Sequence, residues 1–358
     1  MVRVIGVDPG SASWDFVGME DDGTFFLDHS IPTKQIQKHP DLFLNLLNTT
    51  EFDVMSAPSG FGLPLKKIED LKEEDYFFAL LKKNPDKGIV LGLGKILKIL
   101  HEQGVNGYFL PSVKHLPTVP RYRKVNKIDL GTADKLCTTV VGIRNQMEDF
   151  KIGPEDSSFI MVEMGYGFNA VLAVENGQII DGIGGSNIMG FRAVGSIDAE
   201  IAYLMGKIKK KDVYSGGVSS IAGYFDMKAE EIVLLAKQDK RTRMAMDAFY
   251  DDLFKAVYAI SASFSSKNAI KEILFAGRLA RIDALINPLI EKLSVIAPPK
   301  VMRSYVPISK ESAQGAAFIA NGLSGGKFKD IIENMKIREA SGSVLDDIYL
   351  PLEQRPQQ

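Results

Sequence analysis

The sequence of 358 residues has little cysteine and histidine, and it has no long apolar run. Its single cysteine, Cys137, excludes an internal disulfide and any metal site built from several thiolates. The four histidines show no close ligand spacing, so we expect no histidine-based metal site. No apolar segment approaches the roughly 20 residues that span a bilayer, and "MVRVIGVDPG" lacks the pattern of a signal peptide. We therefore expect no membrane association.

Neither sign of charge predominates. The 43 basic and 45 acidic residues give a formal net charge of -2, which offers no indication of a nucleic-acid partner. Hydrophobic residues make up 45% and charged residues 25%, as in ordinary soluble globular proteins. With one cysteine, which is most simply a small apolar side chain on a helix, this composition predicts a cytoplasmic protein.

The stretch "VIGVDPGSASWDFVGME" near the N-terminus has a counterpart about 155 residues later. In the first copy an apolar run ends at Asp8, a Pro-Gly-Ser turn follows, and a second apolar run leads to a turn at Gly23. In "FIMVEMGYGFNAVLAVENGQIIDGIGG" an apolar run ends at Glu163, a glycine-rich turn follows, and a second run ends at the hairpin turn Asn176-Gly177. This repeat predicts two homologous domains, each opening with a three-stranded meander.

Apolar spacing predicts the remaining elements and the domain boundaries. Helices are expected over 63–83, 87–104, 131–150, 196–208, 227–238 and 242–266, and from 278 and 312. A strand that ends in a loop is expected within 52–60, a short strand over 105–111, and a strand that ends in a glycine turn within 271–277. The segment "KIGPEDSS" predicts a boundary, which divides the chain into domains 1–153 and 154–340 and a tail over 341–358.

Each meander places a carboxylate and a tight glycine-containing turn at the end of its first strand. Backbone N–H groups in such turns bind anions, but an adjacent carboxylate repels a phosphate unless a cation intervenes. Mg²⁺ suits this role because it binds through one or two carboxylates and bridges to phosphates. Taken singly, either hairpin is more simply a structural turn, but the repetition favours binding.

The predicted binding residues follow from the two turns and from a third glycine turn, which precedes a helix. We expect Asp8 and Glu163 to bind Mg²⁺. The nucleotide is expected to contact Asp8, Gly10, Ser11, Ser13, Gly165, Gly167, Gly277 and Arg278.

These segments resemble motifs of the superfamily that comprises acetate and sugar kinases, heat-shock chaperones and actin. "VIGVDPGSASWDF" is similar to its first phosphate motif, "MVEMGYGFN" to its second and "ILFAGRLARI" to its adenosine motif. "SAQGAAFIANGL" resembles its connecting helix of small residues. The resemblance implies an α/β fold of two RNase H-like domains, each a mixed sheet flanked by helices, with ATP and Mg²⁺ in the cleft between them.

Within that superfamily the sequence most resembles short-chain acyl kinases and a family catalogued as predicted butyrate kinases. "DPGSAS" keeps part of the acyl kinases' first loop, "MGFRAVGSID" is similar to a later segment, and "KVNKIDLGTADKL" is typical of the butyrate kinase group. The resemblance implies that Arg192 stabilises charge on the transferred phosphoryl group, and it also implies a homodimer. Two departures are Asp8, where acyl kinases carry Asn, and Glu163, where they carry His. We find no equivalent of their first-domain catalytic arginine.

Three functions are compatible with these residues. The first is an ATP-dependent kinase of a small carboxylate such as butyrate, with catalytic contributions from Arg192, Asp134 and Glu163. The second is a kinase of a hydroxylated metabolite, which requires Asp134 or Asp129 as a base. Asp134 also lies where an acid simply favours the helix dipole. The third is a non-catalytic ATP-binding regulatory or assembly protein.

A basic cluster, defined by Arg121, Arg123, Lys124 and Lys127, precedes the helix that carries Asp134. It is either a solvated face or a surface that binds an acidic substrate.

Overall fold

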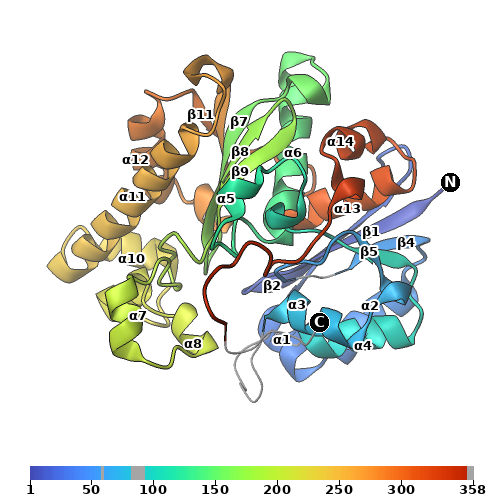
Figure 1. Ribbon diagram of the computed structural model, residues 1–358, viewed down its shortest axis with the longest axis horizontal. Helices are drawn as coiled ribbons and strands as arrows, with labels where there is room; N and C mark the ends of the chain where they lie inside the picture. The colour runs from blue at the N-terminus through green and yellow to red at the C-terminus, as the bar shows by residue number, and fades with distance from the viewer. Residues whose placement is uncertain (58–59, 82–92, 353–358) are drawn as a thin grey trace.

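The computed structural model describes residues 1–57, 60–81 and 93–352. These residues form two mixed β-sheets, one in each half of the chain, with helices packed against them (Figure 1). The predicted α/β class with two sheet-based halves is confirmed. None of the described helices combines the length and the apolar character that a membrane crossing requires.

The first sheet begins with the predicted meander. Its strands are β1 (Arg3–Pro9), β2 (Ser13–Glu20), β3 (Phe25–Pro32), β4 (Val54–Ala57), β5 (Lys66–Lys67) and β6 (Gly107–Phe109), in the order β3-β2-β1-β4-β6-β5. Strands β1, β2 and β3 are antiparallel, whereas β4 runs parallel to β1 and β6 parallel to β4.

The second sheet repeats this arrangement. Its strands are β7 (Phe159–Met164), β8 (Asn169–Glu175), β9 (Gln178–Ile183), β10 (Glu272–Ala276) and β11 (Pro299–Val301), in the order β9-β8-β7-β10-β11. The strand directions match those of β3-β2-β1-β4-β6 in the first sheet. The turn Asn176-Gly177 has φ of 54° and 68°, the left-handed pair that a two-residue hairpin favours. The internal repeat is therefore confirmed as a repeat of topology.

Helices cover both sheets. The first half contains α1 (Thr33–Lys38), α2 (Asp41–Thr49), α3 (Glu73–Leu80), α4 (Leu93–Glu102), α5 (Arg121–Lys124) and α6 (Ala133–Phe150). The second contains α7 (Ala199–Met205), α8 (Lys210–Val213), α9 (Val218–Ala222), α10 (Ala229–Leu235), α11 (Lys240–Ser261), α12 (Asp283–Leu293), α13 (Glu311–Leu323) and α14 (Lys329–Asn334). Short 3₁₀ turns are η1 (Ile68–Asp70), η2 (Val113–His115), η3 (Pro154–Asp156), η4 (Lys267–Ala269), η5 (Arg278–Arg281) and η6 (Ile337–Glu339).

Several predicted helix limits are wrong, and local contacts explain them. The helix expected over 63–83 begins only at Glu73, because Lys66–Lys67 pairs with β6 as an edge strand. The helix expected from residue 278 begins at Asp283, after the 3₁₀ turn η5. The long helix α11 begins two residues early, since the Asp239 carboxylate caps it by accepting from the Thr242 backbone N–H. Parts of the segments 52–60, 63–83 and 87–104 lie outside the described residues.

Helices α6 and α13 pack against each other between the two sheets, and their small residues permit close backbone approach. A Cβ atom at Gly315 would collide with the Cys137 carbonyl oxygen of α6. A Cβ at Gly6 of β1 would collide with the Ala317 backbone nitrogen of α13. Helix α13 thus lies on the first sheet, although it comes from the C-terminal part of the chain (Figure 1).

One hydrophobic core connects the two halves. It contains Val4 and Val17 from the first sheet and Phe159 and Leu172 from the second, together with residues of α6 and α13. The boundaries at residues 153 and 340 stay a prediction.

Candidate functional site

A cavity lies between the two sheets where the glycine turns after β1 and β7 approach each other. A Cβ atom at Gly167 would lie 3.6 Å from the Ser11 Oγ, so the two turns are in near contact. The predicted site residues that line this cavity are Asp8, Gly10, Ser11, Asp134, Glu163, Gly165, Gly167, Gly277 and Arg278. Asp129, the alternative base, also lines it. The structure therefore brings residues from both copies of the repeat into one cavity.

The first turn carries an ion pair whose carboxylate, that of Asp8, is buried. Asp8 is the penultimate residue of β1 and is 4% exposed. Its carboxylate pairs with the Lys310 ammonium and accepts a hydrogen bond of 2.6 Å from the Ser312 hydroxyl. Asp15 on β2 lies 3.7 Å from the same ammonium and accepts from the Ser13 hydroxyl at 2.7 Å. Burial lowers the pKa of Lys310, but the charges of Asp8 and Asp15 outweigh it and raise that pKa above its usual value.

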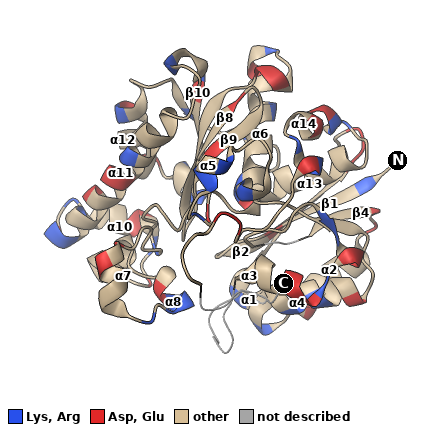
Figure 2. Cartoon of the chain, in the orientation of Figure 1, with Lys and Arg blue, Asp and Glu red and all other residues tan. Residues whose placement is uncertain are grey.

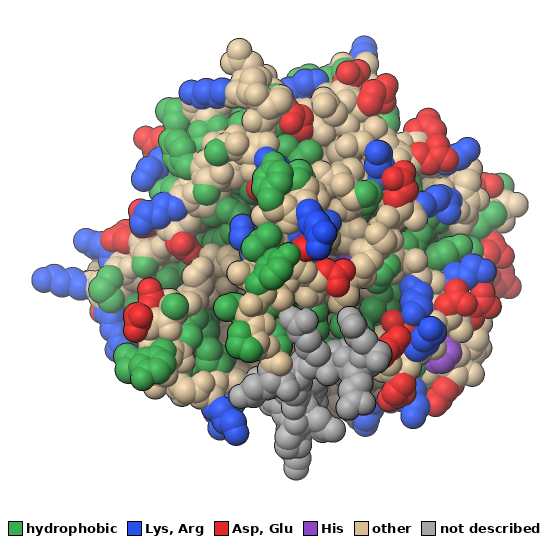
Figure 3. Space-filling view, in the orientation of Figure 1, with side chains coloured by type: hydrophobic (Ala, Val, Ile, Leu, Met, Phe, Trp, Pro, Cys, Tyr) green, Lys and Arg blue, Asp and Glu red, His purple; other side chains and the backbone are tan. Residues whose placement is uncertain are grey.

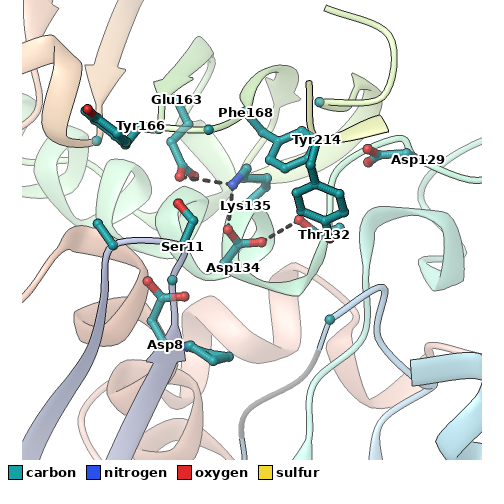
Figure 4. A pocket seen from close by; sticks show the side chains of 18 of the residues that line it. Asp8, Ser11, Asp129, Thr132, Asp134, Lys135, Glu163, Tyr166, Phe168 and Tyr214 are labelled. Atoms are coloured by element: carbon teal, nitrogen blue, oxygen red, sulfur yellow. Dashed lines mark hydrogen bonds and ion pairs between the residues drawn. The ribbon is translucent and has the colours of Figure 1, made fainter. Parts of the chain in front are cut away.

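Beside the second turn lies a triad of two acids and one lysine, in which Glu163 and Lys135 are buried and Asp134 is partly exposed (Figure 4). Glu163 is the penultimate residue of β7 and is 7% exposed. Its carboxylate lies 3.1 Å from both the Lys135 Nζ and the Thr138 hydroxyl. Lys135 also pairs with Asp134 at 2.5 Å, and the Thr132 hydroxyl donates to Asp134 at 2.5 Å. Burial raises the pKa of Glu163. For Asp134 burial acts in the same direction, but the Lys135 charge prevails and lowers the pKa.

Lys135 and Lys310 also line the cavity, and the sequence analysis did not predict them. Lys135 lies in the first turn of α6, and Lys310 immediately precedes α13. In the sequence each lysine is next to an acid, in the pairs Asp134-Lys135 and Lys310-Glu311. These pairs lie at the N-terminal ends of α6 and α13. Comparing these two helix starts could have indicated the lysines, but the partner of Lys310 lies 302 positions away.

The third glycine turn connects the two halves at Gly277 and Arg278. Gly277 has φ of 86°, and a Cβ there would lie 2.6 Å from the Met164 carbonyl oxygen, so glycine is required. The Arg278 guanidinium donates to the Ser13 hydroxyl at 2.6 Å. Ser13 is thus joined to the cavity through Arg278, although it does not line the cavity itself.

Asp129 stabilises the backbone around the cavity. One carboxylate oxygen accepts from the Gly131 N–H at 3.1 Å, and the other accepts from the Ser186 N–H at 2.9 Å. It therefore joins the loop before α6 to the loop after β9.

Aromatic side chains line another part of the cavity. Phe168 and Tyr214 meet edge to face with ring centroids 5.0 Å apart (Figure 4). Phe61 belongs to the first half, and the Lys210 Nζ lies 4.6 Å from its ring centroid. Burial raises the pKa of Tyr214 above its usual value. This region combines an apolar surface with a positive charge.

Arg192 is exposed and does not line the cavity. Its guanidinium lies 4.8 Å from the ring centroid of Tyr166, which does line the cavity. The resemblance-based role of Arg192 therefore stays a prediction.

Three of the four residues of the basic cluster contact other parts of the protein. Arg121 pairs with Asp347 at 2.7 Å, and Arg123 lies 3.6 Å from Asp181. Lys124 donates to the Leu116 carbonyl at 2.8 Å. Acidic and basic residues are interspersed over both halves (Figure 2), and the face in Figure 3 likewise shows no field of one sign.

The cavity's acids are suited to Mg²⁺ rather than to a metal held only by protein. Asp8 and Glu163 offer hard carboxylate oxygens, which Mg²⁺ prefers. Within the described residues, no three His, Cys, Asp or Glu side chains are grouped closely enough to hold a metal ion. Because Mg²⁺ keeps several waters and shares its coordination with phosphates, one or two carboxylates beside glycine turns fit it.

Two sheets that share the order of five strands, with paired glycine turns facing one another, define an actin-like fold of two RNase H-like units. The solved structure of a propionate kinase from Francisella tularensis subsp. tularensis SCHU S4 is similar, with a TM-score of 0.62 and 14% identity, over 88% of this chain and 99% of that one. Acetate kinase from Porphyromonas gingivalis has a TM-score of 0.59 and 14% identity, over 88% and 94%. Acetate kinase from Entamoeba histolytica has a TM-score of 0.56 and 14% identity, over 82% and 89%. At this identity the similarity shows the fold.

The chain itself belongs to the family described as "Protein of unknown function (DUF1464)", which matches residues 6–350. No curated protein matches the sequence.

Proposed function

We propose that the chain is an ATP- and Mg²⁺-dependent phosphotransferase whose acceptor is a small carboxylate such as butyrate. The observation that carries this proposal is that donors engage every carboxylate lining the described cavity, namely those of Asp8, Asp129, Asp134 and Glu163. An alcohol acceptor needs a base to remove its proton, whereas a carboxylate is already an anionic nucleophile. The absence of an unengaged carboxylate among these lining residues therefore favours a carboxylate acceptor.

The phosphates would be bound by the turns around Gly10 and Gly167, whose backbone N–H groups suit an anion. Asp8 and Glu163 would hold Mg²⁺, which neutralises phosphate charge when bound. Lys135 keeps Glu163 and Asp134 together, and Arg192 would supply positive charge beside Tyr166, which lines the cavity.

The aromatic part of the cavity suits the acceptor. Phe61, Phe168 and Tyr214 offer apolar surface for a short acyl chain, and Lys210 places a positive charge beside it. Burial of a few methylene groups there is worth about 0.8 kcal/mol each. We therefore expect longer acyl chains to bind more tightly until the rings exclude them.

Acyl phosphate formation tests the proposal. Protein, Mg-ATP and carboxylates of two to six carbons are incubated, and acyl phosphate is trapped with hydroxylamine. We expect hydroxamate with wild type and a loss of at least about 100-fold in kcat for Arg192→Ala and Glu163→Gln. Arg243→Ala is the matched control, since this arginine donates to the Ala236 and Lys237 carbonyls away from the cavity.

The other outcomes separate the alternatives. ADP release with alcohols alone, lost in Asp134→Asn, would support a kinase of a hydroxylated metabolite. Tight ATP binding without acceptor-dependent turnover would support a regulatory protein. A wild-type protein that binds no ATP would contradict all three. The homodimer and the cytoplasmic location stay predictions.

A further inference from the structure

The two lysines of the site occupy equivalent places in the repeat but pair with acids of the opposite copy. Helix α6 follows the last strands of the first sheet, and its Lys135 pairs with Glu163 of β7 in the second. Helix α13 follows β11 of the second sheet, and Lys310 before it pairs with Asp8 of β1 in the first. Each glycine turn therefore has a cation supplied by the other half of the chain.

Lys310 lies directly against the first glycine turn. A Cβ atom at Gly10 would collide with the Lys310 Nζ, so the ammonium lies over the backbone of this turn. Lys310 lines the cavity, and its side chain is 21% exposed, unlike that of Lys135, which is 9% exposed. An anion that enters the turn after β1 meets this ammonium.

The charges around Lys310 favour an exchange of partners. Asp8 and Asp15 carry two negative charges, and the single positive charge of Lys310 neutralises only one of them. A divalent cation at Asp8 would repel the ammonium at close range, whereas a phosphate in the turn would attract it. The ammonium and the Ser312 hydroxyl both contact the Asp8 Oδ2, so a metal that binds this oxygen must displace them.

We propose that Lys310 is a nucleotide-binding residue that competes with the divalent cation for Asp8 and transfers to a phosphate oxygen when the cation and nucleotide bind together. This inference rests on the proposed function, and it adds a residue that neither the fold nor the sequence motifs assign. The lysine then has opposite effects on the two ligands: it weakens metal binding to the nucleotide-free protein and strengthens nucleotide binding.

Direct binding measurements on Lys310→Met test this pair of effects. We expect the affinity of the nucleotide-free protein for Mn²⁺, followed by the electron paramagnetic resonance signal of free Mn²⁺, to rise several-fold. The affinity for ADP, measured by calorimetry with and without Mg²⁺, is expected to fall at least about tenfold, as for loss of a charge-assisted hydrogen bond. Lys310→Arg should retain ADP affinity within about threefold, because it keeps the charge.

Lys300→Met is the matched control, since Lys300 forms two ion pairs, with Asp149 at 2.8 Å and with Glu272 at 2.5 Å, but does not line the cavity. It should change neither affinity. Asp8→Asn is the second variant if Lys310→Met does not fold. It removes one of the two carboxylates near the Lys310 ammonium and should raise ADP affinity in the absence of metal.

Two results would overturn the inference. Unchanged affinities in Lys310→Met, or parallel losses for Mn²⁺ and ADP, would contradict competition at Asp8 while leaving the proposed function intact. A wild-type protein that binds no ADP under any condition would contradict the proposed function and this role of Lys310 together.

Discussion

Three lysines near α6 differ in the partners of their ammonium groups. Lys135 and Lys310 are paired with carboxylates, whose charges keep the pKa of each ammonium above its usual value despite burial. Lys114 is also buried, but its Nζ donates to the Lys127 backbone carbonyl. Burial, only partly opposed by the charges of Asp346 and Asp347, lowers the pKa of Lys114 to about 8. The ionisation of Lys114 should therefore make the free energy of unfolding depend on pH in the alkaline range.

The stability of the wild type should gain from the deprotonation of Lys114 at alkaline pH. Between about pH 8 and pH 10.5 the unfolded chain keeps a proton on this lysine that the folded chain has lost, so its contribution to the free energy of unfolding rises with pH. Below pH 8 both states are protonated and the contribution is constant. Lys114→Met should lack this rise, as urea unfolding at pH 7, 8, 9 and 10 would measure.

Lys34→Met is the control for this experiment, because Lys34 is an exposed residue of α1. It should follow the pH dependence of the wild type. Parallel curves for wild type and Lys114→Met over this range would contradict the prediction.

The sequence analysis predicted glycines and acids that line the cavity, but not the two lysines beside them. Asp8 and Glu163 were predictable because each ends a strand and is followed by a turn whose residue types have local meaning. Lys310 has no such local signal, since its position beside Asp8 depends on how α13 crosses to the first sheet. Arg192 was predicted by resemblance, and its contact is with Tyr166 rather than with the cavity itself.

At the scale of elements, close packing of β1, α13 and α6 requires glycine at defined points. Gly6 of β1 faces the backbone of α13 near Ala313 and Ala317, and Gly315 of α13 faces the backbone of α6. A side chain at these points has no flexible neighbour to displace. The elements therefore approach until their backbones touch, and this sets the position of Lys310 at the start of α13.

Gly6→Ala should lower the free energy of unfolding by about 1 to 3 kcal/mol, the usual cost of overpacking. The reason is that the added methyl group collides with the backbone of α13. Chemical denaturation measures this change. Gly94→Ala in α4 is the matched control. Its added methyl group would meet the end of a side chain, the Leu80 Cδ1 at 3.3 Å, rather than backbone. The control should change stability by no more than about 1 kcal/mol. Equal stabilities of Gly6→Ala and wild type would disprove the close approach.

At the scale of the whole molecule, the two halves are joined by one core rather than by a simple linker. The central cluster combines residues of both sheets with α6 and α13, and Arg278 joins the second half to Ser13 of the first. Helix α14 follows α13 on the same side of the molecule (Figure 1). The halves share their stabilising contacts, so they should not unfold independently.

We expect a single cooperative transition in differential scanning calorimetry, with calorimetric and van't Hoff enthalpies in agreement. A nucleotide at a concentration 100 times its dissociation constant should raise the free energy of unfolding by about 2.7 kcal/mol. The one transition should therefore move to a higher temperature. Two resolved transitions, of which the nucleotide shifts only one, would contradict a shared core.

The sequence by itself determined the repeated meanders, the position of each glycine turn and the exclusion of disulfides. These features depend on neighbouring residues: alternation of apolar side chains, turn chemistry and the count of cysteines. Only the tertiary structure decided that α13 returns to the first sheet, that Lys135 and Lys310 each pair with an acid of the other half of the chain, and that Arg121, Arg123 and Lys124 contact other parts of the protein. The physical reason is that these arrangements depend on contacts between distant segments, which local periodicity does not encode.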